Sequence, residues 1–325
     1  MMLKSKDIFK KILIGQRDSI DDCYCIEKIN NRFWVGISPD GFPSYLVSGS
    51  SADSEKNPGK ALSGIKVNFG QDCQIVTNEK KSSGIFNIIS CTEENIELRD
   101  FFFSFFDEYF YSEEDINFRN LSMKIENLSK LFSYKKNKSI KSIMGLWSEL
   151  FIIALSKNPE IWAEKWHEQP RSTFDFTFTR MGIDVKSYGS HSREHYFKLE
   201  QLINQSVEQT LILSMCIKEN EDGESVFDIL ALIKDKIKSD ILKKKIEKQV
   251  FKLAGKDIVD SKKFNLDIAK STILILKGKD IPCIDPKSVP ALVSDIKFKV
   301  DCNSIEGVVF DDCNQDKITN NLLLD

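Results

Sequence analysis

The sequence has no apolar stretch long enough to cross a lipid bilayer, and no small-residue cleavage site follows the short apolar patch near its N-terminus. We therefore expect a cytoplasmic protein with no membrane partner. The eight cysteines are scattered, and the close pair Cys23 and Cys25 lacks the second pair that a zinc finger requires. Reduced thiols are expected rather than disulfides or a structural zinc site.

Other signatures are missing as well. The sequence contains no glycine-rich phosphate loop, Ser-His-Asp order, Cys-His pair, helix-turn-helix signature or internal repeat. The formal net charge of −3 does not indicate a nucleic-acid binder. Lysines nevertheless gather locally, with five and no acid in 130–141 and nine in 234–256. Such runs either form solvated helix faces or attract phosphate.

The chain of 325 residues, 23 of them Phe, is long enough for two or three core-forming units. Short strands separated by turn residues fill 20–92, and helices are predicted for 95–111 and 139–157. Further strands are predicted at 172–179, 183–189 and 209–217, in an α/β (α+β) pattern of a small sheet with helices. We divide the chain into a β-rich N-terminal region (1–115), a central core (116–220) and a mixed C-terminal region (221–325).

Two predicted strands bring charged side chains together. Strict alternation places Asp184 and Lys186 on one face, and Asp175 on the polar face of the preceding strand. With a two-residue turn at Arg180-Met181, Asp175 is expected opposite Lys186, Phe176 opposite Val185, and Phe178 opposite Ile183. Two carboxylates beside an ammonium group suit a hard divalent cation.

The pattern of an acid, any residue and lysine is weak alone, because it occurs five times in the chain. The main rival combines Asp285 with Asp295 and Lys297. Asp285, however, lies in a proline-containing loop rather than on a paired strand, so nothing fixes it beside Asp295. An exposed edge strand explains 294–300 better.

The helix before the first site carries Glu149 among large apolar residues. A carboxylate in such surroundings is costly unless it meets a cation or hydrogen-bond donors. Glu149 therefore supports a metal site, extends to solvent, or pairs with Lys141 or Lys157.

These residues carry a resemblance. The helix motif G-L-x-x-E-L, followed by D-F and then I-D-V-K-S, resembles the PD-(D/E)XK nuclease superfamily, and more narrowly a bacterial group found beside DNA methyltransferases in restriction-type defence operons. Phe174 stands where the motif has proline, and Asp184 where Glu is common. The resemblance implies a restriction-endonuclease-like core. It also implies a metal held by Asp175, Asp184 and the Val185 carbonyl with Glu149 in support, while Lys186 orients water.

The remaining polar candidates are weaker. His191 and His195, with Arg193 and Lys198 nearby, are expected at the surface, where they could touch phosphate. Gln201 is a candidate to approach the metal. Trp162, Trp166 and His167 are expected in packing or a loop.

The resemblance implies a Mg²⁺-dependent DNA endonuclease in restriction or anti-phage defence, with Mn²⁺ as a substitute ion. Its partners would be DNA and operon proteins such as the methyltransferase and ATPases, and a homodimer is kept open. The alternative function is a non-catalytic module with a nuclease-like fold that binds nucleic acid or a partner protein. Nothing in the residues themselves distinguishes DNA from RNA.

Overall fold

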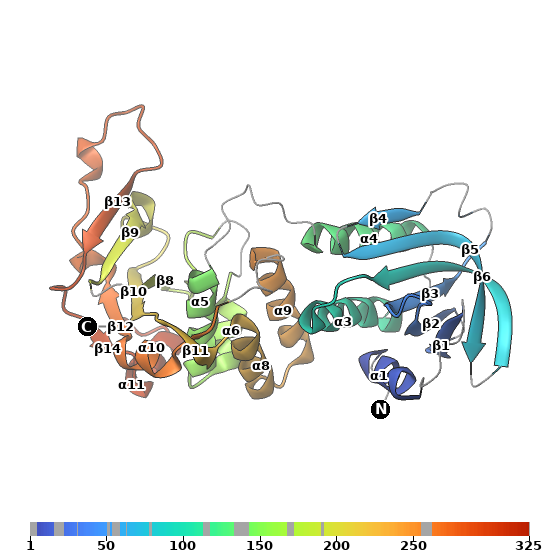
Figure 1. The fold of residues 1–325 in the computed structure, drawn as a ribbon. Coiled ribbons are helices and arrows are strands. Elements are labelled where there is room, and N and C mark those ends of the chain that lie inside the picture. Colours follow the sequence, from blue (N-terminus) through green and yellow to red (C-terminus); the bar gives the residue numbers. More distant parts are fainter. Residues whose placement is uncertain are drawn as a thin grey trace. The chain divides into compact units, whose positions relative to one another are not determined.

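The computed structural model divides the chain into two compact units, residues 1–138 and 139–325 (Figure 1). The described residues are 5–15, 23–30, 32–50, 53, 59–62, 64–77, 80–112, 118–132, 143–167, 172–189, 192–254 and 262–324. No helix in these ranges is long and apolar enough to cross a membrane. The finer division into three regions stays a prediction.

The first unit is built on a six-stranded sheet that closes on itself. Its strands are β1 (Tyr24–Lys28), β2 (Phe33–Ile37), β3 (Pro43–Ser48), β4 (Lys60–Leu62), β5 (Ile65–Thr77) and β6 (Lys80–Cys91). The order is β1-β2-β3-β6-β5-β4, and β1 also pairs with β5 in parallel, so five strands form a ring. This closure pairs β1 with β5, so that β4 is the edge strand of the sheet. The β-rich prediction for 20–92 is confirmed.

Alternation along β3 separates the inside of this ring from its outside. Leu46 belongs to a buried cluster with Ile26, Ile75, Phe86 and Ile88, whereas its neighbour Tyr45 points to the other face. There the Tyr45 ring packs against aromatic side chains of α3 (Ile96–Ser112), with ring centroids 5.0 to 6.1 Å apart. The predicted aromatic helix therefore covers the outside of the sheet. The described residues of this unit also form the helices α1 (Ser5–Gly15) and α4 (Phe118–Phe132).

The second unit contains a five-stranded mixed sheet of order β14-β12-β10-β8-β7. The central strands β8 and β10 run parallel and the outer pairs antiparallel. β10 is buried along almost its whole length, as expected for a strand covered on both faces, which agrees with the buried strand predicted for 209–217. The strands are β7 (Phe176–Thr177), β8 (Met181–Tyr188), β10 (Gln209–Cys216), β12 (Leu274–Lys277) and β14 (Val308–Val309).

Two layers cover this sheet. Helix α5 packs on β8, α6 and α8, and its residues Leu146 to Ala154 are all buried. On the other face of β10, Ile212 packs against Phe197 of β9, and Figure 1 shows β9 and β13 away from α5. The remaining elements are α5 (Ile143–Leu155), α6 (Pro159–Lys165), β9 (Glu194–Lys198), α7 (Leu199–Leu202), β11 (Glu219–Glu224), α8 (Val226–Lys236), α9 (Asp240–Ala254), α10 (Leu266–Thr272), η2 (Gly278–Asp280), η3 (Pro286–Ser288), β13 (Lys297–Asp301) and α11 (Asp312–Thr319).

The register of the β7–β8 hairpin differs from the prediction. Phe176 pairs with Ile183 rather than Val185, and backbone bonds between Phe178 and Met181 (2.8 and 3.3 Å) place the turn one residue earlier, at 179–180. The predicted pairing of Asp175 with Lys186 is therefore wrong. Gly182 explains the difference, because the Phe174 ring would lie 2.3 Å from a Cβ there, so this glycine accommodates a ring within the strand rather than making the turn.

The register shifts by two residues, so Phe176 still faces an apolar residue of β8, since strands have a period of two. Phe176 and Phe178 are buried against Trp162, as predicted for the apolar face. The buried Phe174 ring lies over Gly182, on the Asp184 side of β8, so the prediction that Phe174 shares the face of Phe176 and Phe178 is wrong. The structure is an α+β fold consistent with a restriction-endonuclease-like core, which confirms the predicted fold class.

Candidate metal centre

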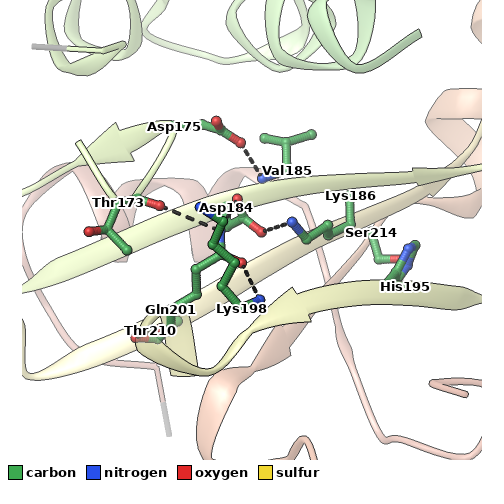
Figure 2. A network of polar contacts seen from close by, with 10 residues as sticks. All are labelled: Thr173, Asp175, Asp184, Val185, Lys186, His195, Lys198, Gln201, Thr210 and Ser214. Carbon is green, nitrogen blue, oxygen red and sulfur yellow. Dashed lines mark hydrogen bonds and ion pairs between the residues drawn. The ribbon is translucent and has the colours of Figure 1, made fainter. Parts of the chain in front are cut away.

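Asp175 lies directly before β7, where the hairpin ladder ends. Its Oδ2 accepts a hydrogen bond of 2.8 Å from the Val185 backbone N–H, so this side chain satisfies a strand donor that β7 no longer reaches (Figure 2). Asp175 is 8% exposed. The carboxylate is thereby fixed at the edge of β8. The structure shows this role for the Val185 N–H; metal binding through the Val185 carbonyl stays a prediction.

Asp184 and Lys186 lie on the same face of β8, as the alternation predicted. The Lys186 Nζ is 2.6 Å from Asp184 Oδ2, and Gln201 Nε2 donates to Asp184 Oδ1 over 3.1 Å (Figure 2). Gln201 comes from α7, and the Phe197 ring of β9 lies 5.7 Å from the Lys186 ammonium. Gln201 therefore contacts Asp184, and its approach to a metal ion stays a prediction. Asp184 is thus held in place by a cation and an amide.

Glu149 is completely buried in the middle of α5. Its Oε2 accepts a hydrogen bond of 2.9 Å from Trp166 Nε1 and lies 3.0 Å from His167 Nε2. Of the lysine partners considered from the sequence, Lys157 pairs with Asp316 instead, at 2.7 Å. Lys141 lies outside the described residues.

Three side chains form a group suited to a metal ion. One potential ligand atom from each of Glu149, His167 and Asp175 lies within 4.8 Å of the others. These residues come from α5, from the end of α6 and from the segment before β7. Asp184 does not belong to this group, because its carboxylate is directed toward Lys186 and Gln201.

The chemistry of the donors fits a divalent cation. Glu149, Asp175 and Asp184 are 0%, 8% and 4% exposed, and three buried carboxylates are costly unless positive charge accompanies them. Lys186 supplies one such charge. A divalent ion held by the carboxylate oxygens would supply more, and oxygen ligands are the ones that Mg²⁺ and Mn²⁺ accept.

His195 is buried rather than exposed, contrary to the sequence expectation. Its Nε2 lies 2.7 Å from Ser214 Oγ, which also accepts a hydrogen bond of 2.8 Å from Arg193. Because Arg193 donates to this hydroxyl, the hydroxyl hydrogen is available for Nε2 and the neutral ring is favoured. Burial, followed by the charges of Lys186 and Arg193, lowers the pKa of His195 from 6.5 to about 4. Arg193 also bonds the Thr272 carbonyl at 2.9 Å, so it ties β9 to β10 and α10.

The remaining aromatic candidates have two different roles: one packs in the core, and two contact Glu149. Trp162 is packing, as expected, with its ring centroid 5.1 to 5.5 Å from those of three phenylalanines. Trp166 and His167 are buried or partly buried too, but they contact Glu149, which sequence reasoning missed. No sequence signal marked them, since their contact depends on how α6 ends. His191 lies outside the described residues.

The rival pattern at Asp285 and Asp295 does not form a comparable group. Asp285 Oδ1 accepts a bond of 2.9 Å from the Lys287 backbone N–H at the start of η3. Asp295 is exposed, with a left-handed backbone φ of 54°. Lys297 belongs to β13 and lies 5.0 Å from the Tyr196 ring. This part of the described chain contains no metal-ligand group.

Comparison with known families agrees with this geometry. Residues 11–303 match the family described as "Putative PD-(D/E)XK family member" (DUF4420). The chain belongs to this family. The predicted superfamily membership is therefore confirmed, with a nuclease-like fold. No curated protein and no solved structure matches the chain.

Proposed function

We propose that this PD-(D/E)XK family member is a divalent-metal-dependent nuclease that hydrolyses phosphodiester bonds of DNA. The observation that carries the proposal is that buried carboxylates lie on and beside β8: Glu149 and Asp175 form one group with His167, and Asp184 pairs with Lys186 on β8 itself. A bound Mg²⁺ or Mn²⁺ would lower the pKa of water and polarise the phosphate. That chemistry matches hydrolysis of a charged, unreactive diester.

Each residue has a role that follows from its position. Asp175, fixed on the Val185 N–H, and Asp184, held by Lys186 and Gln201, present carboxylate oxygens as metal ligands. Lys186 is 21% exposed at its side chain, so its ammonium can hold and orient a water molecule beside the phosphate. Glu149 supports the site from α5.

The substrate class and cellular setting rest on the family resemblance. We propose DNA as the substrate and a restriction or anti-phage defence system as the setting, with operon proteins such as a methyltransferase and ATPases directing the cut. On this proposal the isolated chain nicks DNA weakly and with little sequence preference. Adding the operon partners raises the rate or confines cutting to unmodified DNA, whereas efficient cleavage at one defined sequence by the chain alone would assign the reading function to this chain.

The test compares matched substitutions on supercoiled plasmid. Asp184→Asn and Lys186→Met should each lower the cleavage rate about 100-fold or more, because each removes a ligand or the group that orients water. The controls are Asp295→Asn and Lys297→Met, the same change of charge at an exposed acid-x-lysine pattern. Asn tolerates the left-handed backbone of Asp295, so this control should fold normally.

The results distinguish two functions. Cleavage that depends on Mg²⁺ or Mn²⁺ and is lost only in the site variants supports the nuclease. DNA binding without cleavage by the folded wild-type chain, under every metal tested, would instead support the non-catalytic module.

A further inference from the structure

The imidazole of His167 lies inside the group of potential metal ligands around Glu149. Its Nε2 is 3.0 Å from Glu149 Oε2, and the ligand atoms of Glu149, His167 and Asp175 all lie within 4.8 Å of one another. Two neighbouring ligands on an octahedral ion with bonds of about 2.1 Å are about 3.0 Å apart, and opposite ligands are about 4.2 Å apart. The 3.0 Å between Glu149 and His167 equals the separation of neighbouring ligands, and the 4.8 Å limit for the whole group is close to that of opposite ligands.

The backbone holds His167 in this position. Its φ of 43° is in the left-handed region, which non-glycine residues seldom adopt. Its N–H donates a hydrogen bond of 2.9 Å to the Asp175 carbonyl, which ties the histidine to the acid beside it. Strained backbone of this kind persists where surrounding structure fixes it, and it is frequent at functional sites.

Neighbouring groups orient the ring and the carboxylate. The Trp166 ring lies against His167 with centroids 5.3 Å apart, and Trp166 Nε1 donates to Glu149 Oε2 over 2.9 Å. Hydrogen bonds that orient a ligand in this way are typical of metal sites. The His167 side chain is 17% exposed, so solvent reaches the group.

We propose that His167 is a direct metal ligand and makes the centre select a transition-metal ion of the Mn²⁺ class over Mg²⁺. The inference rests on the proposed function and deepens it. Carboxylate and water ligands suit Mg²⁺ and Mn²⁺ alike, whereas an imidazole nitrogen suits transition-metal ions and not Mg²⁺. His167 therefore adds a nitrogen donor to the carboxylates of Glu149 and Asp175, which shifts the preference of the centre toward Mn²⁺ and makes Mn²⁺ the resident ion rather than a substitute.

The test is metal affinity, measured by calorimetry on the full chain with Mg²⁺ and Mn²⁺ separately. The variant is His167→Asn, because Asn tolerates a left-handed backbone and removes the imidazole. Mn²⁺ affinity should fall by at least about 10- to 100-fold, the range known for groups that merely orient a ligand. Mg²⁺ affinity should fall less, so the ratio of the two affinities should move toward one. Electron spin echo measurements on bound Mn²⁺ should show ¹⁴N coupling in the wild type and none in the variant.

A structural role for His167 gives a different result. If the histidine only positions Glu149, both affinities fall by the same factor and no ¹⁴N coupling is seen in the wild type, which overturns the proposal. Asp295→Asn is the matched control and should leave both affinities unchanged. The outcome is independent of cleavage: Mn²⁺-selective binding without DNA hydrolysis supports the His167 ligand and refutes the nuclease, whereas cleavage with an unchanged metal preference in His167→Asn does the reverse.

Discussion

The buried imidazole of His195 makes the stability of the chain depend on pH in a defined window. Its pKa falls from 6.5 to about 4 on folding, because burial and the nearby charges of Lys186 and Arg193 disfavour the protonated ring. As pH falls below 6.5 the unfolded chain takes up a proton that the folded chain refuses until about pH 4. The stabilisation is thus fully present above pH 6.5 and is lost progressively toward pH 4.

The expected magnitude follows from the shift. Between pH 7 and pH 5 the unfolded imidazole becomes almost fully protonated and the folded one stays mostly neutral, which removes about 2 kcal/mol of stability. Over the whole window the loss is about 3 kcal/mol. Other groups titrate in this range as well, so the contribution of His195 must be isolated by a variant.

His195→Gln provides that comparison, because the Gln amide oxygen can accept from Ser214 and does not titrate. Urea unfolding at pH 7, 6 and 5 gives the free energy of unfolding of both proteins. The wild type should lose about 2 kcal/mol more than the variant between pH 7 and pH 5. Parallel pH profiles for the two proteins would refute the buried, neutral imidazole.

Four further expectations concern the core and the site. Trp162→Ala should destabilise the chain by about 3–5 kcal/mol in urea unfolding, because it leaves a cavity among three phenylalanine rings; a change under about 1 kcal/mol would contradict this packing. Trp166→Phe should lower metal affinity about 10- to 100-fold in calorimetry, since Glu149 loses its indole donor, and an unchanged affinity would remove Glu149 from the site. Ca²⁺ should bind and promote DNA binding without turnover, as gel shift and cleavage assays would show, because its looser coordination positions water poorly; rapid Ca²⁺-driven cleavage would contradict this. DNA binding should weaken as salt rises if the lysines of 234–256 contact phosphates, and a flat response would make them a solvated face.

The spacing of apolar and polar residues along the sequence predicts much of the fold and part of the candidate site. The alternation around Asp184 and Lys186 was enough to place both on one face of a strand, because strand geometry is local. The hairpin register was not predictable in the same way. The register depends on the Phe174 ring, which covers Gly182. Turn propensities describe only the residues of the turn and therefore do not predict this contact.

The parts of the candidate site that the sequence did not predict depend on contacts between residues far apart in the chain. His195 is in a polar stretch, yet β10 and Lys186 surround it, so its burial follows from strand packing. His167 reaches Glu149 only because the chain adopts a left-handed backbone conformation after α6. Neither Ser214 nor Trp166 belongs to a motif that would have indicated these contacts.

The most direct test of the nuclease assignment is cleavage of supercoiled plasmid by the purified chain in Mn²⁺ and in Mg²⁺, with Lys186→Met and Lys297→Met assayed beside the wild type. The account predicts metal-dependent nicking by the wild type and by Lys297→Met, and no cutting in excess EDTA. It predicts that Lys186→Met lowers the cleavage rate by about 100-fold or more. Undiminished cutting in EDTA, or a wild-type rate for Lys186→Met with folded protein, would contradict the assignment of the metal centre.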